Sequence, residues 1–271
     1  MIWLPLIILA LVQGLTEFLP VSSSGHLVLV HEIFGSSGDW QNHLVLDVAV
    51  HVGTLFSVLL YFRRDVITMI CGLKGLASGN TGSEGAQLNI HVLLASIPVI
   101  IAGYILHKTQ PDWILLLNVM AASTLVFGIL LWIADRLPVQ HKTLKDLTVK
   151  DAILIGLAQT LALIPGTSRS GVTMTASRFL GYSRTESAHF SLLLAIIAIA
   201  GAGVIGACEL AESGNASLGL EALIAAIIAF ASGWVAIKLM MSWLQNHSFA
   251  PFAIYRIILG AALLILINYP A

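Results

Sequence analysis

The sequence predicts an all-α polytopic membrane protein that forms a single membrane domain over residues 1–271. Of the 271 residues, 58% are hydrophobic and only 10% are charged, whereas roughly 25% of an ordinary soluble domain is charged. Apolar runs of about 20 residues, long enough to cross a hydrocarbon core of ~30 Å as helices, recur along the whole chain. No stretch is left over that could form a soluble domain.

Residues 1–34 are apolar but are interrupted in the middle by Pro20. Neither half is comfortably long enough to cross the membrane, so we expect two half-helices that fold back on each other as a re-entrant hairpin. Residues 151–180 repeat this arrangement around Pro165-Gly166. Irregular backbone at membrane depth is tolerated only where it is buried in protein or lines a wet cavity. The two breaks therefore predict where a cavity lies.

Six uninterrupted apolar stretches predict about six transmembrane helices in addition to the two re-entrant helical hairpins. Three stretches follow each hairpin. They are residues 44–62, 88–106 and 113–134 in the first half, and residues 187–209, 218–245 and 251–269 in the second. An odd number of spans per half makes the second half enter the membrane from the opposite side, which is an inverted-topology repeat. We expect the internal repeats at approximately 1–134 and 151–271.

The charges in the loops predict the orientation of the protein. Eight Lys or Arg residues fall in the loops of one side, and Lys108 alone falls in the loops of the other. The cation-rich loops are 63–87, 135–150, 181–186 and 246–250, and the loops opposite them are 35–43, 107–112 and 210–217. By the positive-inside rule the cation-rich side is cytoplasmic. The first hairpin then enters from the outer face and the second from the cytoplasmic face, so that their tips meet near the midplane.

Net charge and cysteine content argue against two other classes of protein. The formal net charge is −1 and the chain has no long basic tract, which argues against nucleic acid as a partner. Cys71 and Cys208 are the only cysteines, and neither lies in a metal-ligand spacing. A disulfide framework or a structural zinc site is therefore not expected.

The first hairpin contains a polar motif that runs from Gln13 to His26. Gln13 and Glu17 are four residues apart, so their side chains lie on one helix face. The serines Ser22–Ser24 open the next helix, where they cap it and present backbone N–H groups to an anion. His26 follows three residues after Ser23, close enough to act as its base or to serve the leaving group. Ionisable residues at membrane depth are energetically expensive, which makes this group a functional hypothesis.

The second hairpin contains the motif Pro165-Gly-Thr-Ser-Arg-Ser-Gly-Val-Thr173. It opens a helix whose N-terminal dipole, together with Arg169, suits phosphate oxygens that an arginine can hold bidentately. An ion pair between Arg169 and Glu17 is the structural alternative, and it would not exclude a function. The expected substrate-binding residues are Gln13, Ser22, Ser24, Gly166, Thr167, Ser168, Ser170 and Thr173.

Single histidines elsewhere are interpreted as packing residues. His51, His91 and His189 each stand alone in an apolar stretch, where a hydrogen-bonded packing role is the common one. The two motifs are different, because they combine an anion site with a nucleophile at membrane depth. This combination indicates chemistry on a phosphorylated lipid.

At these residues the chain resembles the undecaprenyl-diphosphate phosphatase family, which is also known as the bacitracin-resistance protein family. One family signature is an (E/Q)xxxE segment that runs into Pro-x-Ser-Ser-x-Gly-His, and the other is PGxSRSxxT. Here they read Gln13 to Glu17, Pro20 to His26, and Pro165 to Thr173. The resemblance covers the whole chain, since the length, the two-halved hydropathy and the motif positions all fit.

The resemblance implies hydrolysis of undecaprenyl diphosphate to undecaprenyl phosphate and phosphate. This reaction recycles the lipid carrier for cell-wall synthesis and confers bacitracin resistance. It places the protein in the bacterial cytoplasmic (inner) membrane, and the predicted topology turns its site toward the periplasmic side. The expected partners are the lipid substrate and the membrane, with a homodimer as an option.

The resemblance also implies roles for individual residues. Ser23 resembles the nucleophile, His26 and Glu17 resemble acid/base and orienting groups, and Arg169 resembles the diphosphate clamp. Family members need a divalent cation such as Mg²⁺ or Ca²⁺, for which Glu17 is the expected ligand. Many members have Glu where this chain has Gln13, and an amide cannot supply a second negative charge.

Two questions stay open at this point. Ser23 either attacks the terminal phosphoryl group and forms a phosphoserine, or a water activated by Glu17 or His26 attacks directly. The competing function is a transporter or flippase of an anionic polyprenyl phosphate lipid, because inverted repeats and half-helix N-termini are also transporter features. A transporter needs no nucleophile, so Ser23 and His26 favour the enzyme.

Overall fold

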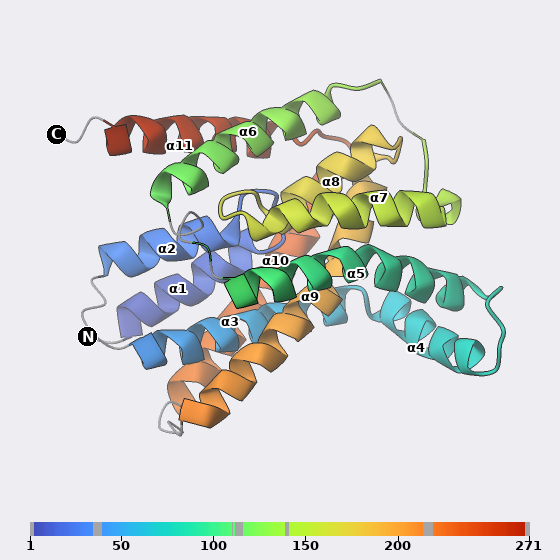
Figure 1. The fold of residues 1–271 in the computed structure, drawn as a ribbon, viewed down its shortest axis with the longest axis horizontal. Coiled ribbons are helices and arrows are strands. Elements are labelled where there is room, and N and C mark those ends of the chain that lie inside the picture. The colour runs from blue at the N-terminus through green and yellow to red at the C-terminus, as the bar shows by residue number, and fades with distance from the viewer. Residues whose placement is uncertain are drawn as a thin grey trace.

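The computed structural model describes residues 3–34, 40–109, 111, 116–138, 141–213 and 219–268. Eleven α-helices and two one-turn 3-10 helices make up this part of the chain, which contains no β-strand, and the all-α class is confirmed. The helices are α1 (Trp3–Thr16), α2 (Ser23–Ile33), α3 (Trp40–Tyr61), α4 (Arg63–Ala77), α5 (Glu84–Thr109), α6 (Leu117–Asp135), η2 (Leu144–Asp146), α7 (Val149–Thr160), η3 (Leu161–Leu163), α8 (Arg169–Phe179), α9 (Arg184–Ser213), α10 (Gly219–Leu244) and α11 (Ala250–Asn268) (Figure 1).

The apolar helices agree with a polytopic membrane protein. Within the described residues, α5, α6, α9, α10 and α11 are each long and apolar enough to cross a membrane. The sixth expected span, residues 44–62, corresponds to α3, which passes the same test only together with α4. Parts of the loops 35–43, 107–112 and 210–217, which we assigned to the outer side, lie outside the described residues.

The expectation of a loop at residues 63–87 is wrong for most of that segment. Residues Arg63–Ala77 form α4, which is bent by 86° from α3. α4 exposes Ile67, Ile70 and Leu73 but also carries several charges, so its average hydropathy is too low to mark it as an apolar element. It packs on α5, where Gly72 allows contact with the backbone of Gly85.

Two helix pairs occupy the positions of the predicted hairpins. α1 and α2 are separated by a turn that contains Pro20, and α7 and α8 by a segment that contains Pro165-Gly166. Each first helix packs against a long helix of the other half of the chain, α1 against α10 and α7 against α5. Glycines allow this approach, because a Cβ on Gly14 would lie 2.7 Å from the Ala229 carbonyl oxygen, and one on Gly156 would lie 2.5 Å from that of Ala95. The re-entrant placement and the repeat boundaries stay predictions.

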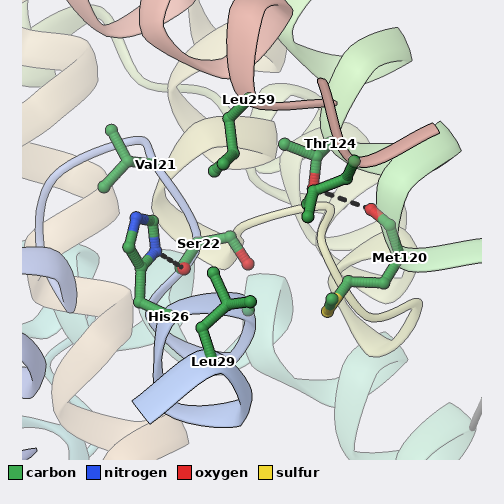
Figure 2. A pocket seen from close by; sticks show the side chains of 9 residues that line it. Val21, Ser22, His26, Leu29, Met120, Thr124 and Leu259 are labelled. Carbon is green, nitrogen blue, oxygen red and sulfur yellow. Dashed lines mark hydrogen bonds between the residues drawn. The ribbon is translucent and has the colours of Figure 1, made fainter. Parts of the chain in front are cut away.

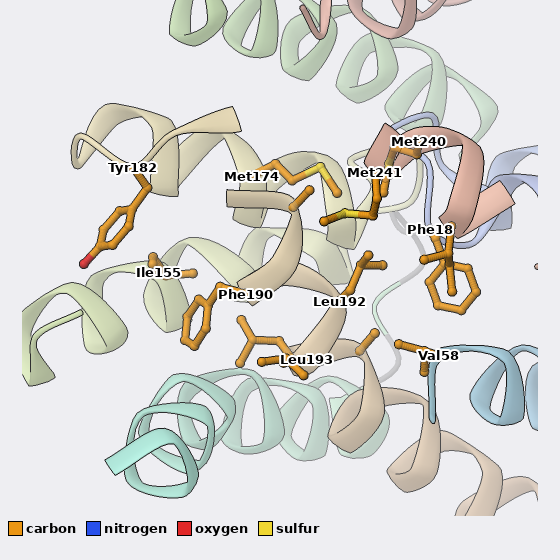
Figure 3. Packing of buried hydrophobic residues seen from close by; sticks show 14 of the residues in the cluster. Phe18, Val58, Ile155, Met174, Tyr182, Phe190, Leu192, Leu193, Met240 and Met241 are labelled. Atoms are coloured by element: carbon orange, nitrogen blue, oxygen red, sulfur yellow. The ribbon is translucent and has the colours of Figure 1, made fainter. Parts of the chain in front are cut away.

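The main hydrophobic core surrounds α9. Phe190, Leu192 and Leu193 of this helix are almost completely buried, and they pack in one cluster with apolar side chains from both hairpins and from α3 and α10. Figure 3 shows Phe18 of the first hairpin and Met174 of the second in this same cluster. The core therefore holds the two hairpins in a fixed relation to each other.

Arg256 of α11 joins the two hairpin turns. Its side chain is fully buried, and its Nη2 donates to the carbonyl oxygens of Gly166 at 2.9 Å and Thr167 at 2.7 Å. Its Nη1 donates to the carbonyl oxygen of Pro20 at 3.4 Å. A helix break leaves carbonyl groups without intrahelical partners, and lipid cannot supply any. The guanidinium therefore satisfies acceptors that the breaks create.

We expect Arg256→Met to lower the free energy of unfolding by about 2–4 kcal/mol, because several buried carbonyl groups lose their donor at once. The measurement is thermal unfolding of the purified protein in detergent. Lys238→Met, at an exposed position of α10, is the matched control and should leave the transition nearly unchanged. Equal transitions for both variants would show that the turns do not depend on Arg256.

Candidate active site

The two hairpin turns share an unusual backbone conformation. Ser22 and Ser168, each just before a helix, have positive φ values of 75° and 68°, and no other non-glycine residue in the described part of the chain does. Such strain persists only where the surroundings enforce it, and it clusters at functional sites. In both turns the sequence continues Ser-x-Ser-Gly, with Ser23 at the central position of the first turn and Arg169 at that of the second.

Hydrogen bonds hold the second turn in place. The Ser168 hydroxyl accepts from the backbone N–H of Gly171 at 3.1 Å and so caps α8. Ser170 donates to the carbonyl oxygen of Leu19 at 2.9 Å, which ties the second hairpin directly to the first. Gly166 has a φ of 87° and lies against Met120 and Thr124 of α6, where a side chain would not fit.

Glu17 accepts hydrogen bonds from residues of both motifs. Its Oε2 accepts from Ser23 Oγ at 2.7 Å and from Gln13 Nε2 at 3.0 Å, and its Oε1 accepts from Arg169 Nη2 at 3.0 Å. The carboxylate is only 8% exposed, so these charge-assisted bonds form in a medium of reduced dielectric. Ser23 and Arg169, which are 146 positions apart in the sequence, therefore approach the same carboxylate.

A cavity of about 160 Å³ opens at this group of side chains. The described residues that line it are Glu17, Ser22, Ser23, Ser24, His51, Ala162, Ser168 and Arg169. Arg169 Nη1 has no hydrogen-bond partner among the described residues, so the guanidinium keeps a donor beyond the one given to Glu17. Hydroxyl groups, a guanidinium and the starts of α2 and α8 together suit a phosphate-type anion.

Five predicted binding residues lie outside the lining of the cavity. They are Gln13, Gly166, Thr167, Ser170 and Thr173. Thr173 is buried on α8, where its hydroxyl donates to Arg169 O at 2.8 Å and lies 2.7 Å from Ser191 Oγ of α9. Thr167 is fully buried as well. Both residues are therefore placed to hold the second turn in its conformation.

Both ring nitrogens of His26 are engaged by groups other than Ser23. Its Nδ1 donates to the carbonyl oxygen of Ser22 at 2.6 Å, and its Nε2 lies 2.5 Å from the Tyr255 hydroxyl of α11. The two rings are stacked. Figure 2 shows the imidazole in a different, small pocket with Val21 and Leu29. Among the described residues no hydrogen bond joins the ring to Ser23, so a role of His26 as the base for Ser23 stays a prediction.

The structure adds three residues that sequence reasoning missed. His51 of α3 lines the cavity, although we interpreted it as a packing residue. Tyr255 engages His26, and Arg256 holds the two turns. Tyr255 and Arg256 lie in an otherwise apolar span, and a buried arginine at that depth was the signal that could have identified this segment.

The side chains at the cavity do not fit a metal ion held by the protein. Glu17 is the single carboxylate among the described lining residues, and both of its oxygens already accept from cationic or neutral donors. In the described part of the chain no group of three or more His, Cys, Asp or Glu side chains is placed to hold a metal. Hard divalent cations prefer several oxygen ligands at once, and Gln13 has its amide nitrogen turned to Glu17.

Comparison with known proteins gives a consistent result over nearly the whole chain. Residues 6–262 match the model of the family described as bacitracin resistance protein BacA. The undecaprenyl-diphosphatase of Hahella chejuensis is 45% identical over 266 residues, which are 98% of each chain. Undecaprenyl-diphosphatase 1 of Rhodospirillum rubrum is 46% identical over 270 residues, which are 98% of this chain and 95% of that one. The undecaprenyl-diphosphatase of Ruegeria pomeroyi is 45% identical over 260 residues, 96% of each chain.

The ion pair at the cavity makes a prediction about stability. Removing one partner leaves an uncompensated charge in a poorly solvated place, whereas removing both does not. We expect Arg169→Met alone to lower the free energy of unfolding by roughly 1.5–3 kcal/mol. The double variant Glu17→Gln with Arg169→Met should recover most of this loss in thermal unfolding measurements. Additive losses in the double-mutant cycle would argue against coupling between the two side chains.

Proposed function

The chain belongs to the bacitracin resistance protein family, and we propose that the cavity at Glu17 is where it hydrolyses undecaprenyl diphosphate. The protein is a multi-pass membrane enzyme, an undecaprenyl-diphosphatase, whose products are undecaprenyl phosphate and phosphate. Hydrolysis of the diphosphate recycles the lipid carrier used in cell-wall synthesis. Resistance to bacitracin fits the description of the family.

One observation carries the assignment of the site. The Ser23 hydroxyl donates to Glu17 at 2.7 Å, while Arg169 donates to the other oxygen of the same carboxylate. A serine bound to a base and beside a fixed cation has the arrangement of an activated nucleophile at an anion site. A binding protein or a transporter would have no use for the bond between the serine and the carboxylate.

In the proposed first step, Ser23 Oγ attacks the terminal phosphorus and its proton passes to Glu17. The bond between that phosphorus and the bridging oxygen breaks, and the electron pair leaves with undecaprenyl phosphate. Lipid phosphate is a stable anion, so the leaving group needs no proton. Arg169 would stabilise the charge that develops on the phosphoryl oxygens, with help from backbone N–H groups at the starts of α2 and α8.

Gln13 and Ser168 support this arrangement. Gln13 is completely buried and donates to Glu17, so it orients the carboxylate toward Ser23. Ser168 caps the helix on which Arg169 is the first residue. We propose that both act by positioning the groups that react, since neither has to exchange a proton.

The divalent cation and the homodimer stay predictions from the family resemblance. The cavity offers the cation no set of protein ligands, and no step of the proposed reaction runs through it. Direct attack by water stays the alternative to a phosphoserine. A lipid flippase is the competing function, since each hairpin opens a helix at the same cavity.

Purified wild-type protein in detergent micelles should release phosphate from undecaprenyl diphosphate. Ser23→Ala and Arg169→Ala should each lower kcat by ~10³-fold or more, because one loses the nucleophile and the other the charge stabilisation. Ser78→Ala, at an exposed site beyond α4, is the control. No phosphate release by the wild type would refute the enzyme, since micelles allow no transport. Near-normal turnover by Ser23→Ala would refute the covalent route.

We also propose that the site opens to the periplasmic side, on the basis of the loop charges. Single cysteines introduced as Ser37→Cys and His141→Cys, in a chain without Cys71 and Cys208, report the two sides of the membrane. An impermeant maleimide added to intact spheroplasts should label the first and spare the second. Labelling of both positions from the same side would overturn the topology.

A further inference from the structure

We propose that His51 is the general base that activates the hydrolytic water in the second half of the reaction. This inference rests on the proposed phosphoserine at Ser23. His51 lies on α3, outside both sequence motifs, and lines the same cavity as residues of the two hairpin turns. It is the one histidine among the described residues that line this cavity.

A hydrogen bond to the backbone fixes the tautomer of His51. Its Nδ1 lies 2.6 Å from the carbonyl oxygen of Asp47, one turn earlier on α3. A carbonyl oxygen can only accept, so Nδ1 carries the proton and the neutral ring has its lone pair on Nε2. Nε2 has no hydrogen-bond partner among the described residues, so it is available to a molecule in the cavity. A base oriented by a second group through its other ring nitrogen is the arrangement that general-base catalysis requires.

The chemistry of the second step requires a base other than Glu17. After the first step Glu17 holds the proton of Ser23, and the serine oxygen must take it back because an alkoxide is a poor leaving group. Glu17 therefore cannot also remove a proton from the attacking water. Gln13 is an amide and cannot accept one.

His26 is poorly placed for this task. Its Nδ1 donates to the carbonyl oxygen of Ser22 and its Nε2 is engaged by the Tyr255 hydroxyl, and it lines a different pocket (Figure 2). Arg169 is a permanent cation and the serine hydroxyls are weak bases. Among the described side chains of the cavity, His51 is the remaining group that can accept a proton.

The proposed step balances in atoms and charge. The water oxygen forms a bond to the phosphorus of phospho-Ser23 while one water proton passes to His51 Nε2. The bond between Ser23 Oγ and phosphorus breaks, and Oγ regains its proton from Glu17. Free phosphate leaves, and the His51 imidazolium returns its proton to solvent or to the departing phosphate.

The experiment follows phosphate on the protein as well as turnover. His51→Gln should lower steady-state kcat by ~10²–10⁴-fold while the first step continues. A rapid-quench experiment with substrate labelled at the terminal phosphate should then show a burst of undecaprenyl phosphate. Label should accumulate on Ser23 in the denatured protein, approaching one phosphate per active chain, and peptide mass spectrometry locates it.

Further variants separate this role from a structural one. His51→Asn keeps a donor near the position of Nδ1 and should show the same trapped phosphoserine. In His51→Ala, added imidazole should release the trapped phosphate. His91→Gln, a histidine of α5 outside the cavity lining, is the matched control and should turn over as the wild type does.

Two results would overturn the proposal while leaving the phosphatase intact. One is wild-type kcat in His51→Gln, and the other is reduced kcat in a folded His51→Gln or His51→Asn protein without labelled Ser23. Failure of the proposed function itself looks different, because the wild-type protein would then release no phosphate in the same assay.

Discussion

The structure depends on hydrogen-bond donors for the backbone carbonyl groups that two helix breaks leave unpaired inside an apolar protein. Each hairpin contains a turn at which a helix ends, and the carbonyl groups at that end have no intrahelical partner. Arg256 supplies donors to both turns at once, at Pro20 on one side and at Gly166 and Thr167 on the other. One side chain therefore makes two otherwise costly breaks compatible with burial, and it fixes the distance between them.

That fixed distance is what creates the cavity. Ser22 and Ser168 have positive φ values, and the residues that follow them, Ser23 and Arg169, each donate to one oxygen of Glu17. The carboxylate can then bind a neutral hydroxyl and a cation together, so it is not an isolated buried charge. Strain in the two turns is thus coupled to the arrangement of the reactive groups.

Much of the fold and part of the site could be predicted from the sequence. The long spans, the two breaks and the meeting of both motifs all follow from hydropathy and from the cost of ionisable groups in lipid. α4 was missed because a charged, amphipathic helix has low average hydropathy. The contact of His26 with α11 could not be predicted, because spacing along a helix does not reveal which distant side chain meets the ring. Its partner Tyr255 lies 229 positions away.

By itself the sequence determined the class of protein, the family and the residue types of the reaction, because composition and short motifs are local properties. Tertiary structure alone decided which groups share the cavity. In the structure His26 contacts Tyr255, His51 of α3 lines the cavity, and Arg256 donates hydrogen bonds to the turns. The physical reason is that a proton-transfer or hydrogen-bonding role depends on distances and directions between side chains. Packing of helices remote in the chain sets those distances.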